Sequence, residues 1–154
     1  MRRQEIPAEE QAPRQLRLHR EHLAAMQRVV MEASPEEGCG LVLGTAGVGL
    51  EVVPVENALH SPTRFRLEGA AQVRALLRAE EKGWELVAVF HSHPQGPSCP
   101  SPTDLAEASY PDALCLIWAP GKGRRWECLA FELRGVSVAE GAREFVPARV
   151  VSEE

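Results

Sequence analysis

The sequence predicts a single α/β (α+β) domain of three helices and about six strands. Apolar residues recur at helical spacing in two long segments, and short apolar runs bounded by Gly, Pro or polar residues fill much of the rest. The chain has 154 residues with no internal repeat and no linker, which suits one domain with one substantial core. We expect a flexible N-terminal segment at 1–15, the domain at 16–147 and an acidic C-terminal tail at 148–154.

Three segments carry the signals of a helix. The apolar positions of the first two follow the helical period, with Pro35 just beyond the first and Gly83 directly after the second. The third is short and begins at Ser101, which suits the N-cap, followed by Pro102, which suits the first helical position. We expect helices at 16–33, 68–82 and 102–109.

Apolar runs of strand length lie between these helices and after the last one. We expect strands at 39–44, 50–55, 84–90, 113–118, 126–133 and 136–139. The Gly-rich connection 45–49 predicts a hairpin turn, and it lacks the Lys-Ser/Thr ending of a phosphate-binding loop. Residues 57–67 should form a loop that leads into a short strand around 63–67.

Composition argues against several classes of partner. A net charge of −5 and a pI near 5.6 disfavour nucleic acid as the main partner. No stretch approaches the roughly eighteen apolar residues that a membrane span needs, and the N-terminus offers no apolar core for a signal peptide. We therefore expect a cytoplasmic protein that binds neither nucleic acid nor membrane, and the sequence leaves a homodimer open.

The four cysteines show no metal-binding or disulfide pattern. Cys39, Cys115 and Cys128 lie in or beside apolar segments, where a free thiol behaves as a small hydrophobe. Disulfides are not expected in a reducing compartment. Cys99 lies in the Pro-rich loop described next, where it is a bystander, an oxidation-sensitive thiol or an inhibitory metal ligand; we favour the bystander.

The stretch 91–104 carries the strongest functional signal. His91 and His93 follow the apolar strand 84–90, and residues i and i+2 of a strand point to the same face, so both imidazoles can bind one zinc ion. Asp104 is the nearest well-placed third ligand, across a loop that three prolines stiffen. His-x-His alone is weak evidence, and Ser-x-x-Asp alone is usually a capping box. Together and in this order they predict a metal site with an open position for water.

Hydrolysis at such a site also needs a group that moves protons. Glu36 and Glu37 lie between the first helix and the first strand, and the residues alone neither choose between them nor exclude that both are solvated surface acids. The hydroxyl of Ser101 could donate to a developing oxyanion, although this role competes with capping the short helix.

These motifs together resemble those of the JAMM (MPN+) zinc metallopeptidases. The signature of that family is an upstream glutamate, then His-x-His-Pro, then Ser-x-x-Asp with seven residues between the second His and the Ser. The residues that match it are His91, His93, Pro94, Ser101 and Asp104. The family pattern Pro-x-Glu-x-Cys-Gly around the base matches at 35–40 and selects Glu37. The resemblance covers roughly 16–135, including the Val-Glu-Asn segment at 55–57.

The resemblance implies both a fold and a set of roles. The fold is a JAMM/MPN-like curved mixed β-sheet of about six strands, flanked by two longer helices and one short helix. His91, His93 and Asp104 would bind one zinc ion, Glu37 would act as general acid and base, and Ser101 would steady the tetrahedral intermediate.

The resemblance also implies a class of substrate. Family members hydrolyse peptide or isopeptide bonds that follow the C-terminal tails of ubiquitin-like proteins. Only 53 residues (38–90) separate the glutamate from the first histidine and 50 (105–154) follow the aspartate, which leaves little room for insertions and suits the compact stand-alone prokaryotic type. The expected substrate is a ubiquitin-like β-grasp sulfur-carrier protein, cleaved after its C-terminal Gly-Gly, including its adduct with cysteine.

Three other classes of protein are less consistent with the sequence. A non-catalytic MPN-type scaffold that only binds partners generally lacks one or more metal ligands, and none is missing here. A metal-dependent amidohydrolase can begin with His-x-His but needs a barrel of about 250 residues. A zinc nucleoside deaminase would need a downstream Pro-Cys-x-x-Cys, which is absent.

Overall fold

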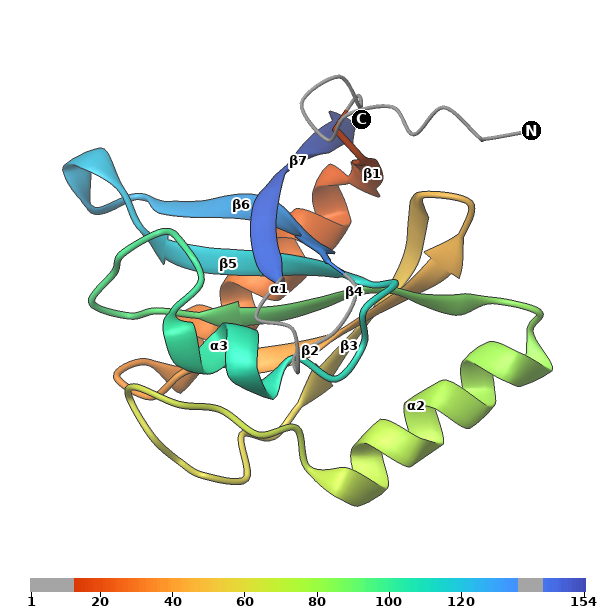
Figure 1. Cartoon of the computed structure of the whole chain (residues 1–154), viewed down its shortest axis with the longest axis horizontal. Helices are drawn as coiled ribbons and strands as arrows, with labels where there is room; N and C mark the ends of the chain where they lie inside the picture. The colour runs from red at the N-terminus through yellow and green to blue at the C-terminus, as the bar shows by residue number, and fades with distance from the viewer. Residues whose placement is uncertain (1–12, 136–142) are drawn as a thin grey trace.

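The computed structural model describes residues 13–135 and 143–154, and the strands in these ranges close into one curved barrel (Figure 1). The strands are β1 (Gln15–His19), β2 (Cys39–Thr45), β3 (Val48–Val55), β4 (Glu85–Ser92), β5 (Leu114–Pro120), β6 (Trp126–Arg134) and β7 (Glu144–Glu153). The helices are α1 (Arg20–Ala33), α2 (Gly69–Glu81), the short α3 (Pro102–Glu107) and a 3₁₀ turn, η2 (Lys122–Arg124). This arrangement confirms the expected class, a mixed sheet with two longer helices and one short helix.

The order of the strands brings two distant chain segments together. The sheet runs β1-β3-β2-β4-β5-β6-β7, and β7 returns to pair with β1. β4 lies between β2, which is antiparallel to it, and β5, which is parallel to it. The register places His91 of β4 opposite Cys39 of β2 and Ile117 of β5. The start of β2 therefore lies beside the end of β4.

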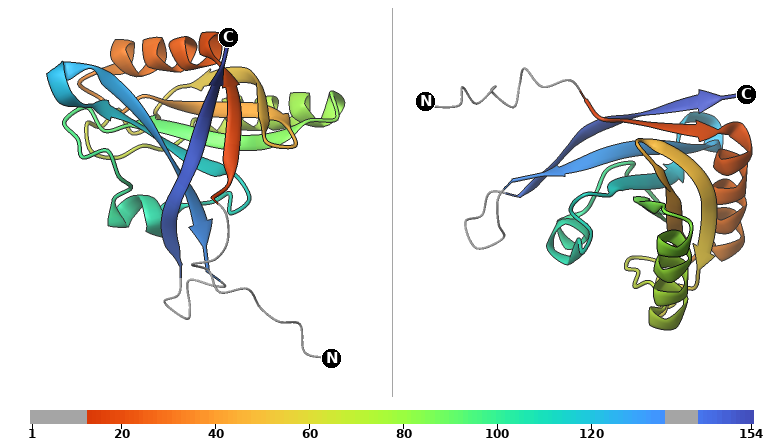
Figure 2. Two further views of the ribbon diagram at one scale, coloured as in Figure 1. Left: turned by 90° about the horizontal axis from the view of Figure 1, so that it is seen from above. Right: turned by 90° about the vertical axis from the view of Figure 1, so that its right-hand side faces the viewer.

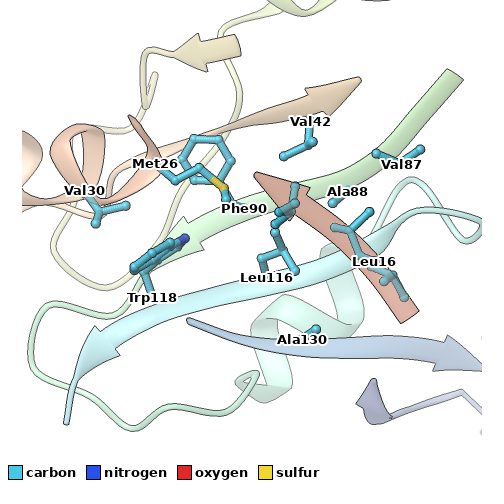
Figure 3. Packing of buried hydrophobic residues seen from close by; sticks show 12 residues of the cluster. Leu16, Met26, Val30, Val42, Val87, Ala88, Phe90, Leu116, Trp118 and Ala130 are labelled. Atoms are coloured by element: carbon cyan, nitrogen blue, oxygen red, sulfur yellow. The ribbon is translucent and has the colours of Figure 1, made fainter. Parts of the chain in front are cut away.

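β2 is buried along almost its whole length because a helix covers each of its faces. On one face Val42 belongs to the same core cluster as Met26 of α1 and Phe90 of β4 (Figure 3). On the other face Leu41 packs with Ala75 of α2. The views of Figure 2 show α1 and α2 on different sides of β2 and β3. Burying each large side chain contributes about 1.5–3 kcal/mol, so this layer is a main source of stability.

From Ala88 onward, β4 sends alternate side chains to these two faces. Phe90 points into the core shared with α1, where Leu116 and Trp118 also lie (Figure 3). Its neighbours Val89 and His91 must therefore face the side that α2 covers. The first histidine of the motif is placed by the same alternation that builds the core.

The expected helix at 16–33 is wrong in its first turn. Residues 15–19 form β1, whose exposed and buried positions alternate, with Leu16 and Leu18 pointing inward. The helix begins at Arg20, and its buried residues include Met26 and Val30. The spacing of Leu16 and Leu18 is compatible with the two-residue repeat of a strand as well as with a helix. The pairing of β1 with β7 selects the strand.

The C-terminal expectation also needs correction. The acidic tail expected at 148–154 is instead mostly strand, because β7 pairs with β6 on one side and with β1 on the other. Ala148 and Val150 pack against the core while the charged residues between and after them stay exposed. Five of the six expected strands lie in the described residues, and β1 and β7 bring the described total to seven. The strand expected at 136–139 lies outside the described residues, and the one expected around 63–67 is only an isolated bridge between Asn57 and Leu67.

Candidate metal centre

The end of β4 presents the two histidines. His91 is almost completely buried, with 1% of its surface exposed, and the N–H of His93 donates to the carbonyl of Trp118 on β5 at 2.8 Å. This bond continues the β4–β5 pairing past the last residue of β4 and fixes the backbone of His93. The Nε2 atoms of the two rings lie 3.2 Å apart, so both imidazoles point at one position.

The first turn of α3 brings Asp104 to the same point. Asp104 is the third residue of the helix, and its Oδ2 accepts from the N–H of the N-cap residue Ser101 at 2.8 Å. The same oxygen lies 3.2 Å from Nε2 of His91 and 3.1 Å from Nε2 of His93. Burial alone would raise the pKa of Asp104, but the hydrogen bonds with both imidazoles and Ser101 bring it well below its usual range. These contacts therefore favour the ionised form of Asp104.

Each imidazole directs its Nε2 atom toward the shared position. Nδ1 of His93 lies 2.8 Å from the carbonyl oxygen of Pro97, which can only accept, so Nδ1 donates to it and Nε2 is the nitrogen that faces Asp104 and the position of a metal ion. Burial alone would lower the pKa of His93, but the hydrogen bonds with Asp104 and Pro97 raise it in the metal-free protein, and a bound metal ion would take the place of the proton on Nε2. Burial lowers the pKa of His91, which keeps its ring neutral. The ring of Phe65 stacks on that of His91, with centroids 4.2 Å apart and planes 19° apart.

Glu37 is the acid that the fold places beside the histidines. It lies just before β2, has 3% of its surface exposed, and can bring a carboxylate oxygen within 4.8 Å of a ring nitrogen of both His91 and His93. Burial raises its pKa to about 7, the charge of His93 opposes this rise, and the charge of Asp104 adds to it. A carboxyl with this pKa can both take and give a proton near neutrality. Glu36 instead lies at the surface, near the ring of His60.

Ser101 can cap α3 and still donate a hydrogen bond. Its Oγ accepts from the N–H of Asp104 at 3.0 Å. Accepting uses a lone pair and leaves the hydroxyl proton available. The expected conflict between the two roles of Ser101 is therefore absent in this geometry.

Three residues at the site were missed from the sequence. Ser92 is fully buried between the two histidines, and its Oγ accepts from the N–H of Gly38 at 2.8 Å while its own N–H donates to the Gly38 carbonyl. Asn57 donates to the carbonyl of Glu37, and Phe65 stacks on His91. In the sequence, Ser92 is only the spacer of His-x-His, Asn57 belongs to the Val-Glu-Asn segment that resembles the family but receives no role, and no local pattern marks Phe65.

A cleft of about 390 Å³ opens next to His91 and Asp104. Its walls come from the loop 65–67, from the segment after α3 and from β4 to β7, and most of them are apolar. They include Phe65, Leu67, Tyr110, Leu114, Leu133 and Phe145. The cleft therefore borders two of the three side chains that converge at the site, His91 and Asp104. Cys99 is exposed, and among the described residues it does not join the group of possible ligands formed by Glu37 and the two histidines.

Two imidazoles and a carboxylate converge beside a buried carboxyl whose pKa lies near neutrality, an arrangement that could hold a metal ion. The family described as prokaryotic homologs of the JAB domain matches residues 19–129. The chain is 31% identical over 121 residues to the CysO-cysteine peptidase of Mycobacterium tuberculosis, covering 77% of this chain and 80% of that protein. The chain therefore belongs to the family of prokaryotic JAB-domain homologs, and it is a hydrolase of the JAMM type.

Further relatives and solved structures agree. The "Probable TtuB-protein conjugate cleaving protease" of Thermus thermophilus is 39% identical over 82 residues, which is 53% of this chain and about half of that protein (55%). The solution structure of protein DSY2949 from Desulfitobacterium hafniense superposes with a TM-score of 0.75 at 25% identity, covering 90% of this chain and 93% of that one. A JAB1/MPN domain protein from Archaeoglobus fulgidus gives 0.50 at 19% identity, covering 88% and 99%, which shows the shared fold. Over residues 13–135 and 143–154, no helix is long and apolar enough to cross a membrane.

Proposed function

We propose that this protein is a zinc-dependent hydrolase that cleaves the peptide or isopeptide bond after the C-terminal Gly-Gly of a ubiquitin-like β-grasp sulfur-carrier protein. The bond that joins such a carrier to cysteine is one of its substrates. The observation that carries the proposal is the triangle of ligand atoms from His91, His93 and Asp104 beside the buried carboxyl of Glu37.

The spacing of the three ligand atoms fits a tetrahedral zinc ion. Zinc bonds of about 2.0–2.1 Å at tetrahedral angles place neighbouring ligand atoms about 3.3–3.4 Å apart. In this structure the three distances among Nε2 of His91, Nε2 of His93 and Oδ2 of Asp104 are 3.2, 3.2 and 3.1 Å. Two neutral imidazoles and one carboxylate are ligands that zinc accepts, and three protein ligands leave one position open for reaction.

The proposed reaction assigns one task to each remaining residue. Zinc, when bound, acts as a Lewis acid that polarises water and the substrate carbonyl. Glu37 takes a proton from the attacking water as its oxygen bonds to the carbonyl carbon, and gives this proton to the leaving amine as the C–N bond breaks. Ser101 donates its hydroxyl proton to the developing oxyanion. The products are a carrier with a free Gly-Gly carboxylate and an amine.

The cleft and the relatives support the proposed substrate. A cleft that borders His91 and Asp104 with apolar walls suits an extended tail better than a folded segment. Glycines beside the scissile bond would approach the site with the least steric hindrance. Two relatives carry names that describe cleavage of a TtuB conjugate and of CysO-cysteine, and we extend this substrate class to the present chain.

Mass spectrometry of the products tests this proposal. The zinc-loaded enzyme is incubated with a carrier–cysteine adduct, with an adduct of the same carrier to lysine, and with an unrelated unfolded peptide. We expect loss of the amine from both adducts, an intact Gly-Gly end, and no cleavage of the peptide. Good cleavage of the unfolded peptide with both adducts intact would make the protein a general peptidase instead.

A further inference from the structure

The side chain of Asn57 is a fully satisfied buried amide between β3 and α2. Asn57 is the only asparagine in the sequence and has 6% of its surface exposed. Its Nδ2 donates to the carbonyls of Glu37 and Arg64, each at 3.0 Å. Its Oδ1 accepts from the N–H of Leu59 at 3.0 Å and of Arg66 at 3.1 Å. Both donors and both lone pairs are therefore used.

Three of these partners lie in the same loop, residues 58–66, and the fourth is Glu37. The N–H of Glu37 donates to the carbonyl of Ser61 in this loop at 2.8 Å. Together with the bond from Asn57 to the Glu37 carbonyl, it fixes both backbone groups of Glu37 to one loop. On the other side, Gly38 is bonded to Ser92 of β4. The backbone of Glu37 is thus held between the loop and the strand that carries His91.

The carboxyl of Glu37 depends on this backbone for its position. Its Oε1 is buried, and no group in the described part of the chain donates a hydrogen bond to it. A side chain without a polar anchor is placed by its own backbone and by packing. A shift of the Glu37 backbone would therefore move the carboxyl relative to the histidines.

The same amide also holds the loop against His91. Phe65, which stacks on the ring of His91, lies between the two residues whose backbone groups Asn57 binds, Arg64 and Arg66. The side chain of Arg64 reaches further, to an ion pair with Glu107 at the end of α3. One side chain amide therefore connects the backbone of the proton-transferring acid with the aromatic ring that supports a metal ligand.

We propose that Asn57 is a positioning residue that sets the placement of Glu37 against His91, a role that rests on the proposed function for its effect on catalysis. Asn57 itself touches no reacting atom. If Asn57 only stabilised the loop turn, its loss would lower the stability of the protein. Activity would then fall no further than in a variant that is equally destabilised at a distant position.

The variant Asn57→Asp tests this because it keeps the shape and Oδ1 but replaces the donor by an oxygen that faces two carbonyls. In the zinc-loaded protein we expect kcat for the carrier–cysteine adduct to fall about 10²-fold, the loss typical of a misplacement of about 1 Å. KM and zinc content should stay at their wild-type values. The control is Leu18→Ala, which empties a buried site on β1 beside Gly49, at the opposite end of β3 from Asn57. At a temperature where both variants are folded, the control should keep wild-type kcat.

Amide hydrogen exchange tests the same role without a substrate. The N–H of Glu37 should exchange with solvent at least about fivefold faster in Asn57→Asp than in Leu18→Ala. Losing about one hydrogen bond lowers the free energy of local opening by about 1 kcal/mol, which corresponds to this factor. If Asn57→Asp does not fold, Asn57→Ser is measured in the same way. A kcat within twofold of wild type, or exchange of Glu37 no faster than in the control, would overturn the proposal. If the wild type cleaves no Gly-Gly adduct, the proposed function fails, and the exchange measurement alone decides the role of Asn57.

Discussion

The metal-free protein should be destabilised by the buried carboxyl of Glu37 as the pH rises, and Glu37→Gln should relieve this. Burial raises the pKa of Glu37 from 4.5 to about 7. Below pH 4.5 the carboxyl is protonated in the folded and the unfolded chain, so it contributes no pH-dependent term. Above pH 7 it is charged in both states, and the folded state bears the full cost of a buried charge.

The shift in pKa sets the size of the effect. A rise of the Glu37 pKa from 4.5 to about 7 corresponds to a loss of at most about 3 kcal/mol in the free energy of unfolding. This stability is lost progressively as the pH rises through this window. Glutamine has nearly the same shape and never ionises. The stability of Glu37→Gln relative to wild type should therefore increase by up to about 3 kcal/mol between pH 4.5 and pH 8.

Urea unfolding in the presence of a chelator, at several pH values between 4.5 and 8, measures this difference. Subtracting the wild-type free energy of unfolding from that of the variant at each pH removes most contributions of other titrating groups. A difference that does not change with pH, or that falls as the pH rises, would show that Glu37 is not held in a buried, proton-retaining environment.

Three further predictions follow from the same geometry. His91→Ala and Asp104→Ala should abolish zinc binding, measured by elemental analysis, while circular dichroism remains that of a folded protein, because the core clusters do not include either residue. Ser101→Ala should lower kcat by about 10²-fold or more if its hydroxyl stabilises the oxyanion. The control Thr103→Ala, at an exposed position of the same helix, should leave kcat at the wild-type value. Equal losses of kcat in both variants would show that the effect comes from disturbing α3 and not from the hydroxyl of Ser101. Phe65→Leu should weaken zinc affinity about 10- to 100-fold, as loss of an outer contact to a metal ligand does, and an unchanged affinity in a competitive chelator titration would refute the supporting role of the stack.

The convergence of His91, His93 and Asp104, the proposed metal ligands, could be predicted from the sequence because their placement is local. His91 and His93 share a face by the alternation of a strand, and Asp104 sits in the first turn of a helix that Ser101 caps. Glu37 is different, because only the register of β2 against β4, which pairs Cys39 with His91, brings it to the site. Residue type and position in the sequence do not distinguish Glu36 from Glu37, and only the match to the family pattern selects Glu37.

The parts that the sequence did not reveal depend on partners far along the chain. β1 and β7 are strands because each pairs with the other across more than a hundred residues, and neither run is apolar enough to predict this alone. Asn57 and Phe65 likewise act through contacts with residues 20 and 26 positions away, Glu37 and His91. Local propensity does not encode such contacts, so the roles of these two residues become visible only in the folded structure.

The most direct test of the central claim is the turnover of a carrier–cysteine adduct by Glu37→Gln and Glu36→Gln at equal zinc content. We expect Glu37→Gln to bind zinc as the wild type does and to lose at least about 10²-fold in kcat. We expect wild-type kcat for Glu36→Gln, because that carboxylate lies at the surface near His60. Wild-type turnover by Glu37→Gln with zinc bound, or a matching loss in Glu36→Gln, would contradict the assignment of the buried acid to catalysis.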